Sequence, residues 1–588
     1  MSWELDATDW TRQLSSPLHD GNNPKSLRAS IAAAISMSLS LTTAGRLGFF
    51  IDYSELSDAG THTFYVARTH GSTGAVSVAY ATSGDGHTSV SGVLSWADED
   101  MSIQSFTVAV TPAQLTNHQT TLGLGEHRIV ARLSNPTNSA VLHFGTEETK
   151  AYGVIDNNVL ASDANAVFFD ADATTNGAGT QSNPYNNYYD ARDNVSNKRY
   201  IYGKGTLIAN NSETFNGSNV FFTPSSRASE SQRLYIRNWS GNSLTVTSSV
   251  SNLENGFYSN NLDISFHTYK GIRFADLNCS ASIAQVFGVH YRYADCASIN
   301  IEGCTGENLN GNTGNNALFT PYGVDGFKMW DCNSNGIALG GDQENQNTAM
   351  MVTFQGKNGS VQKCTATNSY SGIYHKQTTL GDVSTSVRFC NLSSGLKMGV
   401  RYSTSGGLDP SHSFTLVQSN IIKGATDGAI NHASSYNDSL LGGRHFWCNN
   451  TIDSCGVGEV AAIHKNEAFS AQIFNNIFLN CRKVWANFTD NSLLKTPDVE
   501  YADFNCEFGT ILLSQKYEYR GVNYSTASAL NTAFSSFAGN DINQSPLFTN
   551  AALGDYTLQA ESPALTSGVD GTQQGVYLGD FYTIGASN

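Results

Sequence analysis

The chain between about residue 45 and residue 158 alternates short apolar runs with polar turns. Gly, Asn, Asp or Ser separates segments that alternate or run apolar for five to eight residues: RLGFFIDYSE, THTFYVARTHG, AVSVAYATSG, GVLSWADED, QSFTVAVTP, HRIVARLSN and AVLHFGTEE. A period of two is typical of β-strands with one buried face. Seven or so short strands in roughly 110 residues predict a β-sandwich over residues 45–158.

From residue 159 the pattern changes to a loose repeat in which an apolar strand ends in a small polar residue. The repeated segments NIEGC, KMWDC, SVQKC, VRFC, LVQSN, FWCNN and IFNN end at Cys304, Cys332, Cys364, Cys390, Asn420, Asn450 and Asn476, at intervals of 28, 32, 26, 30, 30 and 26 residues. Parallel strands need a long return path, and one coil of a parallel β-helix has this length. We therefore predict a parallel β-helix over residues 159–500 and a closing segment over 501–588.

The cysteines fall into columns of this repeat. Four of them precede three asparagines in one column, and Cys455 and Cys481, 26 residues apart, form a second. Stacked strands lie about 4.8 Å apart, so small buried thiols would pack as a ladder and the asparagines would hydrogen-bond along the stack. A disulfide framework or a zinc site is the alternative, but the chain has no CxxC pair. We therefore predict that these cysteines and asparagines pack in the core and have a structural role.

Composition narrows the class of protein. Of 588 residues only 14% are charged and 11 are proline, which argues against disorder and favours an all-β fold. The net charge of −17 argues against nucleic acid and acidic membranes as partners, and no stretch is apolar over the length of a membrane span. Within the N-terminal segment 1–44, the run from Lys25 to Gly45 has the layout of a secretory signal displaced from the start; the alternative is a short amphipathic entry helix. An extracellular or surface location is an expectation.

Two resemblances extend these predictions. RTHGSTGAVSVAYATSGDG, GVLSWADEDMSIQSFTVAV and RLSNPTNSAVL resemble a Calx-β domain over about one fifth of the chain. Some members of that family bind calcium through acidic loops, which here implies Glu55, Asp98, Glu99 and Asp100 as candidates, although Asp98 and Asp100 are equally suited to solvated turns; other members are adhesive or spacer modules. VFFDADATTNGAGTQSNPYNNYYDARDNV and SPLFTNAALGDYTLQAESPALTSGVD resemble the opening, with its short capping helix, and the closing segment of right-handed parallel β-helix proteins of the pectate-lyase-like superfamily.

The coil register predicts a column of polar side chains. Aligning the coils on Ile373, Val400, Ile430 and Ile463 gives GIYHK, GVRYS, AINHA and AIHKN. If each aliphatic side chain points inward, the next residue points outward. The outward column is then Tyr374, Arg401, Asn431 and His464, roughly 15 Å long, with His375, Lys376, Tyr402, His432 and Lys465 at flanking positions.

Such a basic and aromatic stripe suits an extended anionic polymer. Several β-helix families that the chain resembles cleave acidic polysaccharides by β-elimination, which implies a lyase. That chemistry needs a cation beside the uronate carboxylate, a base and an acid. We assign Arg401 as the neutralising cation, Lys376 or His432 as the base, and Tyr374 or Tyr402 as the acid; His375, Tyr402, Asn431, His464 and Lys465 would bind the polymer.

Alternatives remain at this stage. Outward polar side chains are often only solvated or stabilise the sheet, and a ladder can bind a glycan without cleaving it. The carboxylates between Asp325 and Glu467 form no DxD or DD pair of the kind seen in β-helix hydrolases. The main alternative from another class is a non-catalytic adhesin, a cell or virion spike, or a filament-forming structural protein, so self-assembly is an open expectation.

Overall fold

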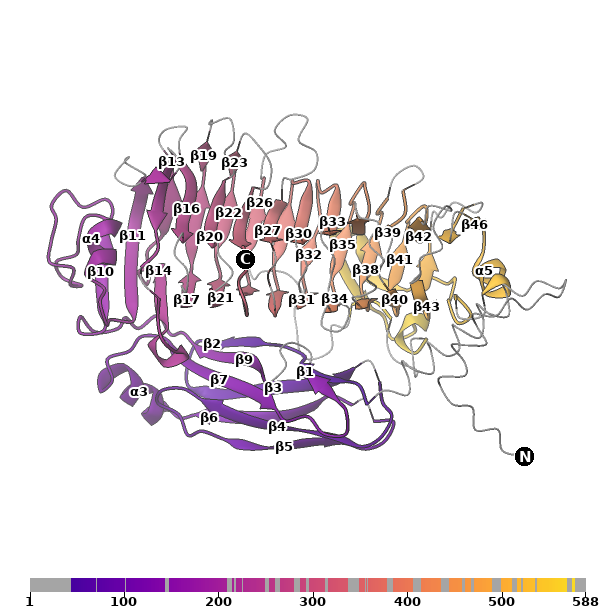
Figure 1. Cartoon of the computed structure of the whole chain (residues 1–588), viewed down its shortest axis with the longest axis horizontal. Helices are drawn as coiled ribbons and strands as arrows, with labels where there is room; N and C mark the ends of the chain where they lie inside the picture. The colour runs from indigo at the N-terminus through magenta and orange to yellow at the C-terminus, as the bar shows by residue number, and fades with distance from the viewer. Residues whose placement is uncertain are drawn as a thin grey trace, which may run out of the picture.

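A computed structural model of the chain describes residues 44–576 apart from a set of short stretches. These stretches are 70, 101, 143–147, 209–213, 216–217, 225, 249–252, 260–264, 280–285, 292–295, 312–315, 337–347, 355, 357, 378–383, 405–413, 435–443, 457–459, 467–469, 489–498, 510–514, 520–521, 535–536 and 568–573. The prediction for residues 1–44, a displaced signal or an entry helix, concerns residues that lie outside the described part except for Ala44. The predicted all-β class, a sandwich followed by a β-solenoid, is confirmed (Figure 1).

The first unit is a sandwich of two sheets. One sheet contains β6 (Gln104–Val110), β3 (Gly60–Thr69), β1 (Arg46–Phe49) and β8 (Val141–Leu142); the other contains β2 (Tyr53–Leu56), β9 (Glu148–Ile155), β7 (His127–Ser134), β4 (Val76–Ser83) and β5 (Ser91–Trp96). A short helix, α3 (Pro112–Thr120), begins with a capping box at Thr111. The alternating strands bury one face: on β7, Ile129, Ala131 and Leu133 lie in the sandwich core. The opposite side of β7 is therefore available to another surface.

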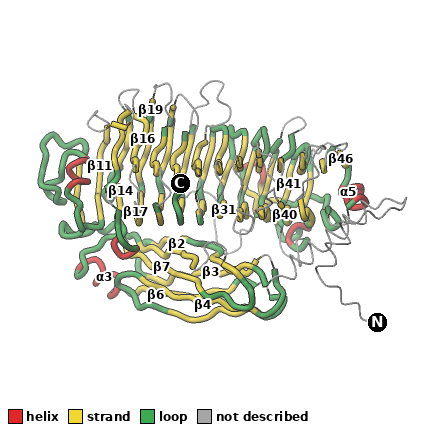
Figure 2. The backbone as a smooth tube through the Cα atoms, in the orientation of Figure 1, coloured by secondary structure: helices red, strands yellow, loops and turns green. Residues whose placement is uncertain are grey.

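The second unit is a solenoid with three faces (Figures 1 and 2). The first face contains β10 (Ala166–Asp170), β11 (Tyr200–Ile208), β14 (Leu234–Asn238), β17 (Ser265–Lys270), β21 (Ala297–Glu302), β25 (Lys328–Trp330), β28 (Gly359–Gln362), β31 (Ser384–Arg388), β34 (Phe414–Gln418), β37 (Arg444–Cys448), β40 (Ser470–Phe474) and β43 (Val499–Asp503). The second face, continuous with the first through β11, contains β15 (Leu244–Thr247), β18 (Ile272–Ala275), β22 (Thr305–Glu307), β26 (Asn333–Asn335), β29 (Thr365–Thr367), β32 (Asn391–Leu392), β35 (Ile421–Lys423), β38 (Thr451–Asp453), β41 (Ile477–Leu479) and β44 (Cys506–Phe508).

The third face is a separate sheet. It contains β12 (Thr214–Phe215), β13 (Ser218–Phe222), β16 (Leu253–Ser259), β20 (Phe287–Tyr291), β24 (Ala317–Pro321), β27 (Thr348–Phe354), β30 (Ser371–Gln377), β33 (Met398–Thr404), β36 (Ile430–Ser434), β39 (Ile463–Asn466), β42 (Trp485–Phe488), β45 (Tyr517–Tyr519) and β46 (Val522–Tyr524). From β13 to β45 its neighbours pair in parallel. A short parallel pair, β19 (Asn278–Cys279) and β23 (Asn310–Gly311), lies in two successive coils between the strand of the second face and the next strand of the third face.

Additional elements cover the ends of the solenoid. Helix α4 (Tyr188–Asp193) lies at the N-terminal end, where the Tyr188 ring packs against Phe169, Phe221 and Phe257, as the predicted capping helix should. Helix α5 (Ala527–Ala533) lies at the other end (Figure 2). The remaining short elements are η1 (Glu230–Gln232), β47 (Phe548–Asn550), η2 (Ala551–Leu553), β48 (Asp555–Leu558) and η3 (Pro563–Leu565).

The predicted ladder of cysteines and asparagines runs through the core. All nine cysteines whose side chains are described are buried and free of disulfides. The asparagines bond along the stack: Oδ1 of Asn450 accepts from the backbone N–H of Asn420 at 3.1 Å and from its Nδ2 at 3.0 Å. Asn450 donates in the same way to Asn476, and Asn476 to Asn505. Asn505 thus extends the column one coil beyond the predicted repeat.

The sandwich packs against the first face of the solenoid through one column of outward side chains. Strand pairing aligns six residues of successive coils: Arg237, Lys270, Glu302, Trp330, Gln362 and Arg388. Each contacts the sandwich. At one end of the column, Arg237 forms an ion pair with Asp156 at 2.8 Å. At the other end, Arg388 donates to the carbonyl oxygens of Phe49 and Phe50. The interface has an apolar centre in which the rings of Tyr53 and Trp330 lie 4.5 Å apart.

The C-terminal segment lies along the second face. The hydroxyl of Tyr556 on β48 donates to Asp453 of β38 at 2.6 Å. Tyr556 and Val576 pack with Ile421 of β35, and Ala564 packs with Ile477 and Cys506. The sandwich therefore occupies part of the first face and the C-terminal segment part of the second.

Candidate functional site

The strand pairing of the third face confirms the predicted alignment of coils. Ile373 pairs with Val400, Val400 with Ile430, and Ile430 with Ile463, and all four are fully buried in the solenoid core. The next residues form the predicted column, in which Tyr374 pairs with Arg401, Arg401 with Asn431, and Asn431 with His464. Because side chains alternate along a strand, this column is directed away from the core.

Arg401 and two tyrosines form the centre of the column. The Arg401 guanidinium lies 4.6 Å from the centroid of the Tyr374 ring and 5.9 Å from that of Tyr370, which is cation–π geometry. Tyr374 is 3% exposed and Arg401 is 8% exposed, so these two side chains are more enclosed than a solvated stripe would be. The half-buried Lys376 and His464 are the more accessible members of the predicted set.

Lys376 lies on the same outward side as Tyr374, two residues further along β30. Burial, and then the positive charge of Arg401, lower the pKa of Lys376 below its usual range. A lysine with a lowered pKa carries a larger neutral fraction near neutral pH, which is the form that accepts a proton. Tyr374, Lys376 and Arg401 therefore place an acid, a base and a permanent cation on one surface.

At the far end of the column, Asn431 and His464 lie within hydrogen-bond reach, with Nδ2 of Asn431 3.3 Å from Nδ1 of His464. Burial, and then the charge of Lys483, lower the pKa of His464 to about 4. Lys483 pairs with Glu518 of β45 at 2.8 Å. The sequence analysis did not find this pair, because Glu518 on β45 lies beyond residue 500, in the segment predicted to close the solenoid, and Lys483 has no signal of its own.

Two residues predicted to bind substrate face the other way. The His375 ring stacks on Tyr402 with centroids 4.8 Å apart, and Tyr402 belongs to the solenoid core, where its ring also approaches His445. Both are 3% exposed, and burial lowers the pKa of His375 to about 3. The alternation of β30 and β33 continues through both positions and directs these side chains inward. The predicted substrate contacts of His375 and Tyr402, and an acid role for Tyr402, are therefore corrected to packing in the core.

His432 and Lys465 are placed by their backbone alone. His432 pairs with Tyr402 on one side and with Lys465 on the other. Their side chains lie outside the part that the structure describes, so their predicted roles stay predictions.

The outward column also extends toward the N-terminus, which the sequence analysis missed. Phe222 pairs with Tyr258, and Tyr258 with His290, with ring centroids 6.0 Å and 5.2 Å apart. Through Thr320 and Val352 this aromatic stretch joins the column at Tyr374. In the sequence, an aromatic residue follows a buried apolar residue in each of these coils, and this pattern could have predicted the extension. The coils were not aligned because no Cys or Asn of the repeated column marks them.

The acidic candidates of the sandwich do not form one group. Glu55 lies at the interface with the solenoid, where it pairs with Lys270 at 3.1 Å. Asp98 accepts from the backbone N–H of Gly74, and Asp100 from that of Ser102, so each serves a local turn. In the described ranges no three His, Cys, Asp or Glu side chains meet in a way that could hold a metal ion.

Comparison with solved structures gives matches over about a fifth of the chain. No family model and no curated protein matches the chain. The apo form of the Calx CBD1 domain is similar at 19% identity, covering 19% of this chain and 95% of that domain, with a TM-score of 0.16. The Calx CBD2 domain matches at 15% identity over 19% of this chain and 87% of its own, also with a TM-score of 0.16. The calcium-binding domain pair CBD12 of CALX1.1 matches at 18% identity over 21% of this chain and 50% of its own, with the same TM-score.

These likenesses concern about a fifth of the chain and carry no argument about activity. The membership of the solenoid in the pectate-lyase-like superfamily stays a prediction. Among the helices of the described residues, none has the length and apolar character needed to cross a bilayer.

Proposed function

We propose that the chain engages an acidic polysaccharide along the outward column of the third face and cleaves it by β-elimination. A β-solenoid with these features is consistent with a polysaccharide-engaging or structural protein. One observation carries the finer proposal: Arg401 lies against Tyr374, and its charge helps to lower the pKa of Lys376 on the same surface. A base activated by a neighbouring cation is what β-elimination from a uronate requires.

The chemistry follows from the three side chains. Arg401 would bind the uronate carboxylate and offset the charge that develops when the adjacent C–H bond breaks. The neutral Nζ of Lys376 would accept that proton, the electron pair would form a C=C bond, and the glycosidic C–O bond would break. The Tyr374 hydroxyl would donate its proton to the leaving oxygen. His432 is the alternative base, and Asn431, His464 and Lys465 would bind the next sugar units.

The arrangement of the other faces supports this choice of surface. The sandwich takes up the outward column of the first face from Arg237 to Arg388, and the C-terminal segment packs on the second face from Ile421 to Cys506. A ligand that runs across several coils has the third face left to it. A surface or extracellular location, where such polymers occur, belongs to the same proposal.

The test is absorbance of the unsaturated uronate product on alginate, pectate, glycosaminoglycans and ulvan, with and without calcium, which Calx-like sandwiches suggest as an additive. Wild-type protein should release product from one polymer, and Lys376→Met and Arg401→Lys should lower kcat at least 100-fold. Arg273→Gln and Lys423→Met on the second face are the matched controls and should leave the rate unchanged. A flat trace on every polymer would remove the lyase proposal; retained binding without cleavage would leave an adhesin or another structural glycan-binding protein.

A further inference from the structure

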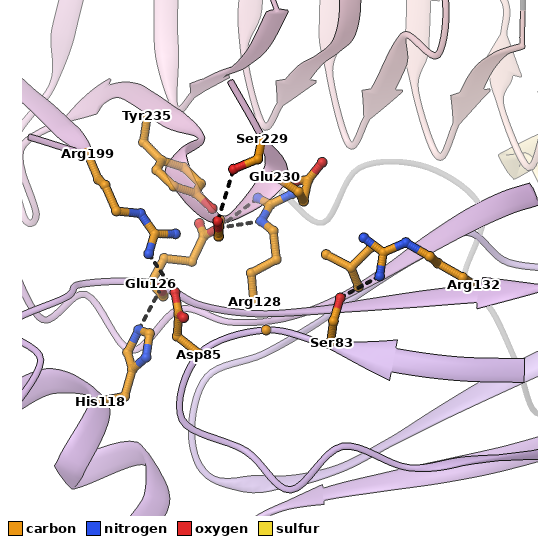
Figure 3. Close-up of a pocket in the computed structure, with 13 residues that line it drawn as sticks. Ser83, Asp85, His118, Glu126, Arg128, Arg132, Arg199, Ser229, Glu230 and Tyr235 are labelled. Atoms are coloured by element: carbon orange, nitrogen blue, oxygen red, sulfur yellow. Dashed lines mark hydrogen bonds and ion pairs between the residues drawn. The ribbon is translucent and has the colours of Figure 1, made fainter. Parts of the chain in front are cut away.

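A cavity of about 350 Å³ lies between the sandwich and the first coils of the solenoid (Figure 3). The sandwich supplies Arg128, Val130 and Arg132 from the outward side of β7, His118 from α3, and the turn after β4. The solenoid supplies Arg199, Ser229, Glu230, Ser231 and Tyr235. The cavity is remote in sequence from the column around Arg401 and is built by different strands.

The wall on the sandwich side depends on a close backbone approach. A Cβ atom on Gly84 would lie 2.2 Å from the carbonyl oxygen of Arg128, and the φ of Gly84 is +147°. Glycine is therefore required at this position for the turn to pack against β7. The turn then holds Asp85 over the solenoid, where it accepts from Nη1 of Arg199 at 2.6 Å. The cavity wall therefore depends on a close contact within the sandwich and on an ion pair between the sandwich and the solenoid.

The charges of the lining balance. The lining contains three cations, Arg128, Arg132 and Arg199, and three carboxylates, Asp85, Glu126 and Glu230. These groups are already engaged in ion pairs, such as Arg128 with Glu126 at 2.7 Å and Glu230 with Arg233. Burial lowers the pKa of His118, so its ring is neutral at pH 7. An ion entering this site would meet no excess of opposite charge, whereas a neutral molecule rich in hydroxyls can both donate to the carboxylates and accept from the guanidinium groups.

One tyrosine hydroxyl of the lining faces the cavity. Tyr235 is 1% exposed, lines the cavity, and directs its hydroxyl end toward the cluster around Glu126 and Arg128 (Figure 3). The ring of Tyr235 contacts the Arg128 guanidinium and the Tyr200 ring, and its hydroxyl opens onto the cavity, where water or a ligand can bond it. Hydroxyl groups in such a site are normally satisfied by protein, water or ligand. The hydroxyl groups of Ser229 and Ser231 bond each other at 3.0 Å at the rim, where Ser231 and Gly84 are exposed.

We infer that this cavity binds a neutral saccharide of one or two hexose rings. Its volume lies at the lower end of small-molecule sites and equals that of about twelve waters in the liquid, enough for a ring sugar with bridging waters or for a disaccharide. The ligand contacts both units, so its binding stabilises the docked arrangement of sandwich and solenoid. This site is separate from the proposed cleavage site and takes uncharged sugar.

Ligand-observed NMR and calorimetry on the full chain test the inference with glucose, galactose, N-acetylglucosamine and maltose, and with glucuronate and sulfate as charged probes. At least one neutral sugar should bind with a Kd below about 10 mM, more tightly than either ion. Tyr235→Phe should weaken that binding about tenfold, because one hydrogen bond is worth about 1.4 kcal/mol.

Two controls make the outcome decisive. Tyr524→Phe, in the hairpin at the opposite end of the solenoid, and Arg401→Lys should both bind the sugar like the wild type. The inference is overturned if no neutral sugar binds, if an ion binds more tightly, or if Tyr235→Phe binds as the wild type does. Unchanged thermal unfolding of Tyr235→Phe without sugar would show that the variant acts on binding alone.

Discussion

Arg128 of the sandwich donates through Nη2 to both carboxylate oxygens of Glu302 in the solenoid, each at 2.8 Å. The same nitrogen and Nε also bond Glu126, and the guanidinium lies 5.2 Å from the centroid of the Tyr152 ring. Burial alone would raise the pKa of Glu126, but Lys270 and Arg128 more than offset it and hold that pKa low. The Glu126 carboxylate is thus kept ionised in a place without solvent.

Arg128→Met should destabilise the docked protein by about 3–5 kcal/mol, because it leaves two buried carboxylates without their shared cation. Arg132→Met is the control on the same strand; its side chain is 27% exposed and pairs with Glu148 at 3.5 Å, so the loss should stay below about 1 kcal/mol. Urea unfolding followed by tryptophan fluorescence measures both. Equal losses in the two variants would contradict the role of the buried network.

Asn450→Ala should cost about 2–4 kcal/mol. The substitution removes the acceptor for the buried backbone N–H of Asn420. It also removes the Nδ2 donor to Oδ1 of Asn476 and to the carbonyl oxygen of Val417, while the backbone N–H of residue 450 still donates to Asn476. Asn333→Ala, at an exposed position of β26, is the matched control and should change the free energy of unfolding by less than about 0.5 kcal/mol. Thermal unfolding monitored by far-UV circular dichroism measures the loss of stability in both variants. A small loss in Asn450→Ala would mean that water replaces the amide in its hydrogen bonds.

Acid should weaken the sandwich below pH 6.5. Burial lowers the pKa of His127 to about 3 and that of His62 to about 4, so both stay neutral in the folded protein while the unfolded chain binds protons. Stability from these groups is fully present above the unfolded pKa and falls as the pH drops toward the folded values, by about 1–2 kcal/mol per histidine at pH 5. Unfolding of His127→Phe between pH 7 and 5 should take up about one proton fewer than unfolding of the wild type. The free energy of unfolding should therefore depend less steeply on pH. An unchanged slope would show that His127 is charged in the folded state.

The pKa of Lys376 should depend on Arg401. Arg401→Gln removes the neighbouring positive charge, so the pKa of Lys376 should rise part of the way toward its ordinary value, while burial, the larger cause, still holds it low. NMR titration of ¹³C-labelled lysine side chains measures this shift, with Lys423 on β35 as the internal reference. If Lys376 titrates identically in both proteins, Arg401 does not tune the proposed base.

The sequence predicted the strands because their burial is local, but the docking of the two units depends on distant residues. The coil intervals and the alignment of Ile373, Val400, Ile430 and Ile463 fixed the register, and with it the neighbours of Arg401. The inward direction of His375 and Tyr402 was missed because the flanking positions were assigned to the outward surface, whereas the alternation of β30 and β33 continues through them. Arg128 and Glu302 are separated by 174 residues, and each alone has the pattern of a solvated charge. Their burial follows from the contact between the units, which no short-range pattern records.

The column from Arg237 to Arg388 also restricts how this protein can change in length during evolution. Its six members occupy consecutive coils, and each meets a fixed partner on one rigid sandwich. An inserted or deleted coil among β14 to β31 would displace every later partner by about 4.8 Å, one strand spacing, and break several buried contacts at once. Duplication of coils after β31 shifts none of them. The docked sandwich therefore restricts coil number only up to Arg388; after it, the contacts of the C-terminal segment with Ile421, Asp453 and Cys506 are the ones that a changed coil number would disturb.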